Sequence, residues 1–274
     1  MSGIEKFEKY EKHISRGIGF KISGSGIISL GGVTVKVSGS GSLEKDELRI
    51  SGSGMVEGRL SLREINVSGS LRVYGDLESE LIKISGSCRV DGSLIASQAS
   101  FSGSCMVVGL FAAKKLLEAS GSLSTGGLEG GDLKISGSLR SKEINGNSLK
   151  LSGTIRVEGD VKCSDIRLTL MGSSYIEGNI EADKLIIRGK ETASRLSVLG
   201  LIIWAKESLP SLHVKNIKAK EVLLEDLQLI CEELRADRVL IGRNVVLEGK
   251  VLYKESIQVD PSARLAKEPE KIPD

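Results

Sequence analysis

Ser-Gly dipeptides recur along the chain at nearly even spacing and constrain its fold more than any other feature. The repeated glycines are Gly24, Gly39, Gly52, Gly69, Gly86, Gly103, Gly121, Gly137 and Gly153, and Gly172 and Gly189 continue the series without the serine. The successive steps are 15, 13, 17, 17, 17, 18, 16, 16, 19 and 17 residues. A fixed period near 17 indicates one structural unit stacked many times, with a long regular surface in place of a pocket.

Each repeat contains three short segments with alternating apolar and polar residues. A second glycine often follows six residues after the first, as in Gly52/Gly58 and Gly69/Gly75. An apolar β-branched residue precedes this second glycine by two positions. These residues are Val56, Val73, Val90, Val107, Val157 and Ile176, and we expect them to form a buried core ladder. The pattern predicts three strands of four or five residues per repeat, with glycines at the corners.

The predicted fold is all-β, a single-stranded parallel β-helix with a triangular cross-section, that is, a β-solenoid. Each strand pairs with its copy in the next turn at a spacing of about 4.8 Å. Left-handed hexapeptide helices keep a strict period of 18, whereas this period varies from 13 to 19, which favours a right-handed coil. Counting repeats from Gly24 to Val259 gives about 14 turns.

The regular array is interrupted once and flanked at both ends. Residues 1–17 are charged, with apolar residues at helical spacing, and predict a capping helix or an arm. Residues 18–189 carry the Ser-Gly solenoid, residues 190–213 predict an irregular insertion, and residues 214–264 predict further turns. The last residues, 265–274, are rich in charge and proline and predict a disordered tail.

Composition argues against several classes of partner. The 274 residues have 38 basic and 36 acidic side chains, a net charge of +2, and 3% aromatic residues. This balance gives no basic footprint for nucleic acid and few rings on which bases could stack. The sequence has no apolar stretch long enough for an integral membrane segment and no signal-peptide core at its N-terminus. We therefore expect a cytoplasmic protein.

Residues for catalysis or metal binding are sparse. His13 lies in the N-terminal arm, and His213 could serve as the base of a hexapeptide-type acyltransferase but more simply is a surface histidine. A carbohydrate-active β-helix enzyme needs clustered carboxylates, whereas the acidic residues here recur at corners, where short polar side chains suit turns. They are Glu57, Asp91, Glu158 and Glu177. We expect no catalytic, cofactor or metal site, and hence no enzyme.

The four cysteines show no CxxC or Cys/His ligand spacing. Cys88 and Cys105 hold the same place in successive repeats, so they should stack within reach of a disulfide. Two reduced core thiols are the favoured interpretation for a cytoplasmic protein. The repeated serines are similarly interpreted as a structural ladder of hydroxyls, the alternative being a flat polar face that binds a regular partner.

Residues 234–265, LRADRVLIGRNVVLEGKVLYKESIQVDPSARL, have an LxAxxVxIG opening followed by VxxEGxV. This stretch resembles the bactofilins, which are polymer-forming cytoskeletal proteins. The resemblance implies a right-handed triangular β-helix without enzymatic activity that assembles end to end into filaments without nucleotide. It also implies a scaffold for cell shape or for client proteins.

The two ends of the solenoid distinguish a polymer from a monomer. A monomeric solenoid needs polar caps, because its terminal turns otherwise expose core and unpaired strand edges. The last predicted turn remains apolar, which predicts a polymerisation interface with other copies of the chain at Val251, Tyr253, Ile257 and Val259. The alternatives are a β-helix enzyme and a monomeric binding module that presents one long flat face.

Overall fold

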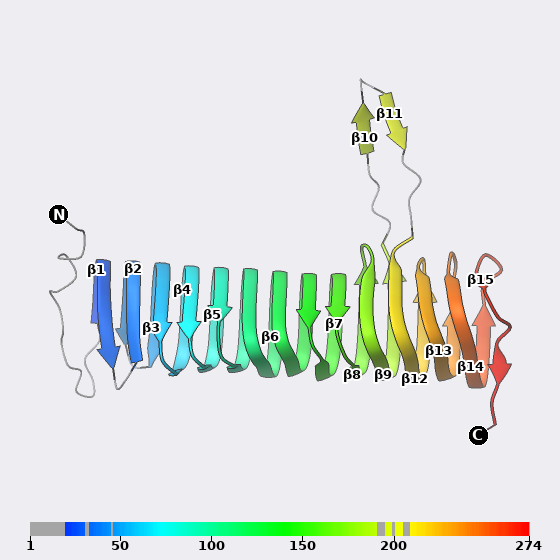
Figure 1. Cartoon of the computed structure of the whole chain (residues 1–274), viewed down its shortest axis with the longest axis horizontal. Helices are drawn as coiled ribbons and strands as arrows, with labels where there is room; N and C mark the ends of the chain where they lie inside the picture. Colours follow the sequence, from blue (N-terminus) through cyan, green and yellow to red (C-terminus); the bar gives the residue numbers. More distant parts are fainter. Residues whose placement is uncertain are drawn as a thin grey trace. The chain divides into compact units, whose positions relative to one another are not determined.

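The computed structural model describes residues 20–30, 33–44, 46–190, 195–198, 201–204 and 209–273 (Figure 1). It is 85% strand with no helix among these residues, and it forms a parallel β-solenoid, so the predicted fold is confirmed. The solenoid has about 12 turns, fewer than the 14 expected. The N-terminal segment 1–17 lies outside the described residues. The chain divides into two compact units, Met1–Gly131 and Asp132–Asp274.

The first unit begins with an antiparallel meander and continues as a parallel coil. Its strands are β1 (Phe20–Leu30), β2 (Val33–Glu44), β3 (Glu47–Glu57), β4 (Leu60–Tyr74), β5 (Leu77–Val90) and the first part of β6 (Leu94–Ser141). The pairs β1–β2 and β2–β3 are antiparallel, whereas β3–β4, β4–β5 and β5–β6 are parallel.

The prediction of parallel pairing is therefore wrong for the first two repeats. Their steps of 15 and 13 residues are too short to travel around three sides, so the chain reverses direction instead. The Ser-Gly positions still align, because Gly24 pairs with Gly39 and Gly39 with Gly52. Omitting these repeats accounts for part of the difference in the number of turns.

The core of the first unit is the predicted valine ladder. Val56, Val73, Val90 and Val107 are in register on neighbouring strands and at most 1% exposed. The Ser-Gly glycines turn the corner beside this ladder with a positive φ, for example 124° at Gly86. A Cβ at Gly86 would also collide with the carbonyl oxygen of Gly69 in the preceding turn. Glycine is needed there for both reasons.

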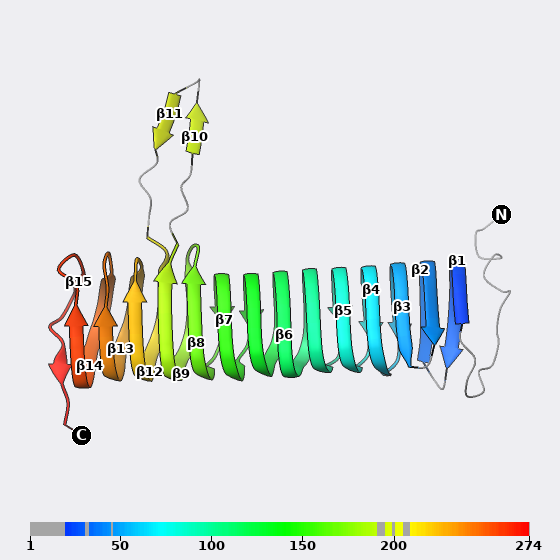
Figure 2. The same cartoon turned by 180° about the vertical axis from the view of Figure 1, so that it is seen from behind.

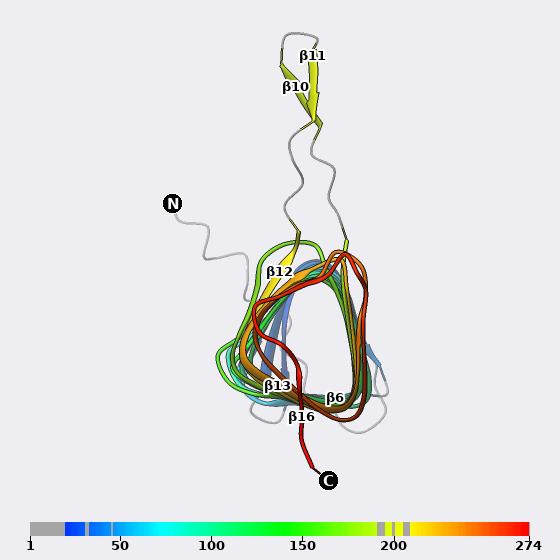
Figure 3. The same ribbon diagram turned by 90° about the vertical axis from the view of Figure 1, so that its right-hand side faces the viewer.

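The second unit is a parallel coil throughout its main sheet. Its strands are the end of β6, β7 (Ile144–Val157), β8 (Val161–Leu170), β9 (Ser174–Gly189), β12 (Ser211–Glu225), β13 (Gln228–Ile241) and β14 (Val246–Val259). Each turn has three sides, seen end-on in Figure 3. The residues buried inside it are mostly Val, Leu and Ile. Val157 and Ile176 pair in register and are buried, as the ladder requires.

The insertion lies between two strands that pair directly with each other. Strand β12 pairs in parallel with β9 although the intervening residues separate them in sequence. Within the insertion, β10 (Arg195–Val198) and β11 (Leu201–Trp204) form an antiparallel hairpin, and not only an irregular loop. The solenoid resumes at Ser211, three residues earlier than predicted.

The C-terminal tail is ordered where it was expected to be disordered. Strand β15 (Arg264–Leu265) pairs with residues 246–247 of β14, and β16 (Glu270–Lys271) pairs with residues 252–253. Figures 2 and 3 show this red segment against the last turn. The composition of the tail suggested disorder, but the last turn offers it unpaired backbone groups and an open core, which outweigh that tendency.

Candidate functional site

The C-terminal end of the solenoid is covered on two of its three sides. Backbone amides of the tail donate to carbonyl oxygens of the last turn, from Arg264 to Val245 at 2.8 Å and from Ile272 to Tyr253 at 2.8 Å. A surface ion pair between Lys250 and Glu270, 2.8 Å long, lies beside the second contact. The tail therefore satisfies part of the strand edge that an uncapped solenoid would leave unpaired.

The third side of this end is open. Residues 256–259 pair on one edge with residues 238–241 of β13, and no strand within residues 209–273 pairs with their other edge. Ile257 is in register with the buried Val239, and Val259 with Ile241. Val259 is 42% exposed, whereas Ile241 is 1% exposed. Two positions of the core ladder thus have no turn above them among the residues that the structure describes.

The four residues predicted for polymerisation do not form one exposed surface. Val251 is fully buried, and Tyr253 pairs with Lys271 of the tail. Only Ile257 and Val259 lie at the open edge. The sequence placed all four in the last turn, but it did not reveal that the tail covers the segment that holds the first two.

The first unit also has an open strand edge, at a place that the repeat pattern did not predict. Strand β3 pairs with β4 only from Glu64 onwards, so residues 60–62 pair with β5 alone among the described residues of this unit. A largely apolar cavity of about 240 Å³ opens at this edge. It is lined by Val33, Val35, Leu43, Leu48, Arg59, Leu60, Ser61 and Leu62. The signal for it was the shortness of the first two repeats.

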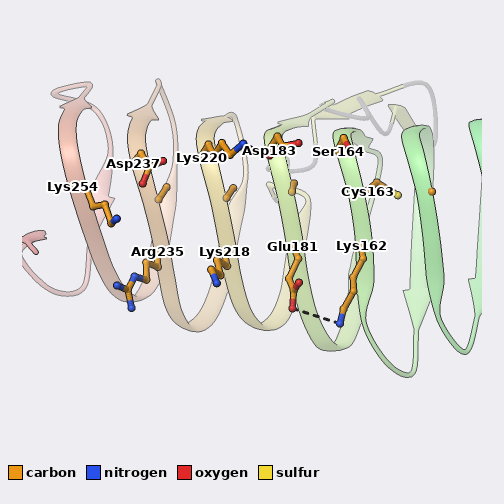
Figure 4. Close-up of a pocket in the computed structure, with 14 residues that line it drawn as sticks. Lys162, Cys163, Ser164, Glu181, Asp183, Lys218, Lys220, Arg235, Asp237 and Lys254 are labelled. Carbon is orange, nitrogen blue, oxygen red and sulfur yellow. Dashed lines mark ion pairs between the residues drawn. The ribbon is translucent and has the colours of Figure 1, made fainter. Parts of the chain in front are cut away.

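A groove of about 710 Å³ runs along one corner of the second unit (Figure 4). Its floor consists of small side chains at equivalent positions of successive turns, namely Gly146, Cys163, Ala182, Ala219 and Ala236. Charged side chains project on both sides of this floor. The hollow exists because small residues alternate with long ones along each strand.

The stacked serines of the first unit line another groove, of about 890 Å³. Ser51, Ser68, Ser85 and Ser102 are in register on neighbouring strands and exposed. Beside them, the guanidinium of Arg49 donates a hydrogen bond to Glu47 and holds the pKa of that carboxyl below its usual range. The serines give a regular hydroxylated strip, as expected from their spacing.

His213 packs as a surface side chain. Its ring stacks on Tyr175 with centroids 4.8 Å apart and an interplanar angle of 18°, and Arg156 lies 6.0 Å from the Tyr175 centroid. No group of three or more His, Cys, Asp or Glu side chains in the described parts of the chain could hold a metal ion. His13 lies outside the described residues.

Two of the four corner carboxylates, Glu57 and Asp91, bind neighbouring cations. Glu57 accepts a hydrogen bond from Lys36 at 2.6 Å, and Asp91 accepts one from Arg89 at 2.6 Å. Glu57 ends β3 and Asp91 follows β5, so β4 separates them, and their partners are exposed lysine and arginine side chains. Such pairs fit the interpretation of these residues as solvated turn residues.

The cysteines are buried free thiols. Cys88 and Cys105 are in register on β5 and β6, and their mutual hydrogen bond together with burial raises the pKa of Cys105. Burial raises the pKa of Cys163 and of Cys231 to about 12. Protonated thiols are weak nucleophiles, so these side chains behave as small core residues.

No family model matches the sequence, no curated protein is significantly similar to it, and no solved structure matches it. Over the described residues, no helix is long and apolar enough to cross a membrane. A functional proposal therefore has to be based on the fold and on the surfaces described above.

Proposed function

We propose that the protein assembles end to end into filaments and serves as a bactofilin-like scaffold that needs no nucleotide. The supporting observation is the open side of the last turn, where Ile257 and Val259 continue a buried ladder that has no further turn. An unpaired strand edge over exposed core positions is a template for another chain.

The energetics of such a contact are favourable. A second molecule that covers residues 256–259 satisfies their free backbone groups and removes two apolar side chains from water. Complete burial of a Val or Ile side chain stabilises by about 1.5–3 kcal/mol, and these two start only partly exposed, so the gain from each is smaller. Several backbone hydrogen bonds add about 1 kcal/mol each.

Each chain has an open edge in both of its units. The second lies at residues 60–62, beside the apolar cavity of the meander. A molecule with two such edges can bind two neighbours, which is the requirement for a filament, whereas one edge supports only a dimer. The scaffolding of client proteins is the part of the proposal that follows from the bactofilin resemblance, and the cytoplasmic location is the part that follows from the sequence composition.

The test compares a positive charge introduced at the open edge with one introduced on the outer surface of the preceding turn. Ile257→Lys and Val259→Lys place an ammonium in the proposed contact, so filaments seen by negative-stain microscopy should give way to short particles. Leu240→Lys is the matched control, because Leu240 is 40% exposed, lies one turn earlier and points outward. Unchanged filaments in both edge variants, or a wild type that stays monomeric at high concentration, would exclude this contact.

A further inference from the structure

The groove of the second unit carries charges that the chain itself does not neutralise. Lys162, Glu181, Lys218 and Arg235 stand in register on one rim. Ser164, Asp183, Lys220, Asp237 and Lys254 stand on the other (Figure 4). The rims thus hold five cations and three carboxylates, an excess of positive charge facing one hollow.

The excess is concentrated in the last three turns. Lys162 pairs with Asp160 at 3.4 Å and with Glu181 at 3.6 Å, and Lys220 pairs with Asp183 at 2.7 Å. Lys218, Arg235 and Lys254 form no ion pair with any described residue. The free cations therefore lie together at one end of the groove, with Asp237 as the single carboxylate among them.

A neighbouring ladder of the same unit shows how this chain normally arranges charges. Lys184, Glu221, Arg238 and Glu255 follow one another on successive turns with alternating sign. Glu221 binds Lys184 at 3.8 Å and also binds Arg238, which in turn binds Glu255 at 3.2 Å. Every charge of that ladder has a partner of opposite sign in an adjacent turn.

The groove departs from this arrangement at Lys218 and Arg235. These two residues are direct cross-strand neighbours on strands about 4.8 Å apart, and side chains of like charge in that position destabilise a sheet. A bound anion between them would remove the repulsion. Lys218 and Arg235 form a like-charge pair that is open to solvent beside a floor of small residues. This arrangement points to an anionic ligand.

We propose that this groove binds an extended acidic segment of a partner protein, with its carboxylates against Lys218, Arg235 and Lys254. The small side chains of Ala182, Ala219 and Ala236 on the floor leave room for a peptide between the two rims. The carboxylates of Asp183 and Asp237 would repel a uniformly charged polymer such as polyphosphate, but they tolerate a peptide whose acidic residues are spaced. The five turns from β8 to β14 span about 19 Å, which an extended peptide of about six residues covers.

We infer that this groove recruits client proteins to the scaffold. Only this recruiting role rests on the proposed function, whereas binding of the peptide does not. The groove lies along the wall of the second unit, and its free cations are not residues of the open edge at 256–259. Peptide binding and self-assembly can therefore be measured separately in the same protein, and either can fail without the other.

The experiment uses fluorescence anisotropy with a labelled twelve-residue peptide of alternating Glu and Ala. The full-length wild type should bind it saturably, and a peptide of alternating Lys and Ala should not bind. The double variant Lys218→Glu/Arg235→Glu should weaken binding at least tenfold while its circular dichroism and its assembly remain those of the wild type. Raising the salt concentration to about 0.5 M should weaken binding strongly, since screening is then much stronger.

The matched control is Lys83→Glu/Lys114→Glu, two exposed lysines of the first unit whose reversal changes the net charge equally. It should bind the acidic peptide like the wild type. Equal loss in this control would mean that overall charge, and not the groove, attracts the peptide. Absence of saturable binding by the wild type, or polyphosphate binding tighter than the peptide, would overturn the assignment.

Discussion

Val259 lies directly beside Ile241 of the preceding turn, yet it is exposed where Ile241 is buried. Both occupy the same inward-pointing position of the repeat, and the difference arises because none of the described residues forms a further turn over Val259. Since the neighbouring sides of this turn are covered by β15 and β16, the open strip is confined to a single segment. The proposed assembly through this end would therefore depend on few residues, and few substitutions can test it.

Removing the tail should increase self-association. Truncation after Asp260 deletes β15 and β16 and uncovers the backbone around residues 246–247 and 252–253. With all three sides of the last turn open, a larger fraction should sediment at equal concentration. Glu270→Ala is the control, because it removes one exposed ion pair worth at most about 1 kcal/mol and keeps the tail. A truncated protein with the size distribution of the wild type would contradict this role of the tail.

Replacing a member of the valine ladder by a carboxylate should unfold part of the first unit. Val90 is completely buried between Val73 and Val107, so Val90→Asp places an unpaired charge in the core. We expect a loss of more than about 4 kcal/mol, measured by urea unfolding followed by circular dichroism. Lys83→Asp, at an exposed position of the same strand, should change the free energy of unfolding by less than about 0.5 kcal/mol. A stable Val90→Asp protein would mean that this position is not in the core.

Gly86 and Gly172, which the sequence spacing assigns to one series, should respond differently to alanine, because Leu170 and not Gly172 pairs with Gly153. At Gly86, φ is 124° and a Cβ would collide with the carbonyl oxygen of Gly69. At Gly172, the nearest atom is the Cγ2 of Thr154 at 3.7 Å, an ordinary contact. Gly86→Ala should therefore cost about 1–3 kcal/mol and Gly172→Ala much less, as measured by thermal or urea unfolding. Equal effects would show that the corner conformation is not the reason for the glycine.

The buried thiols should lower the stability of the protein at alkaline pH. Burial raises the pKa of Cys163 and Cys231 to about 12, whereas an unfolded cysteine titrates near 8.5. Above about pH 8.5 the unfolded state loses these protons and the folded state keeps them, so the free energy of unfolding falls as pH rises toward 12. The double variant Cys163→Ala/Cys231→Ala should show a shallower decrease between pH 8.5 and 11 in urea unfolding. An identical slope in both proteins would exclude this contribution.

The Ser-Gly spacing predicted the solenoid but not the direction of its first strands. Ser-Gly-Ser reads the same in both directions, so Ser38 and Ser40 can pair with Ser51 and Ser53 in either orientation. The motif therefore aligns strands without specifying whether they are parallel. Only the lengths of the connecting segments carry that information, and those of the first two repeats fit a hairpin.

The surfaces were less predictable than the core. Lys218 and Arg235 are 17 residues apart, so aligning the repeats could have revealed them as neighbours of equal charge. The hollow between the rims depends on how small and long side chains pack at a corner, which periodicity does not specify. The tail is ordered because it pairs with the open edge of β14, which lies in another part of the sequence. The composition of the tail alone does not reveal such an edge.

Because β12 pairs directly with β9, the junction after Gly189 can accept insertions of different length. The hydrogen-bonded ladder continues from one strand to the next as though the 21 intervening residues were not there, so its register does not depend on their number. A segment at this junction can lengthen, shrink or be exchanged for a whole foreign module while the coil on either side keeps its pairing. Evolution or an engineer could thus display a passenger domain from this site on every subunit of an assembly.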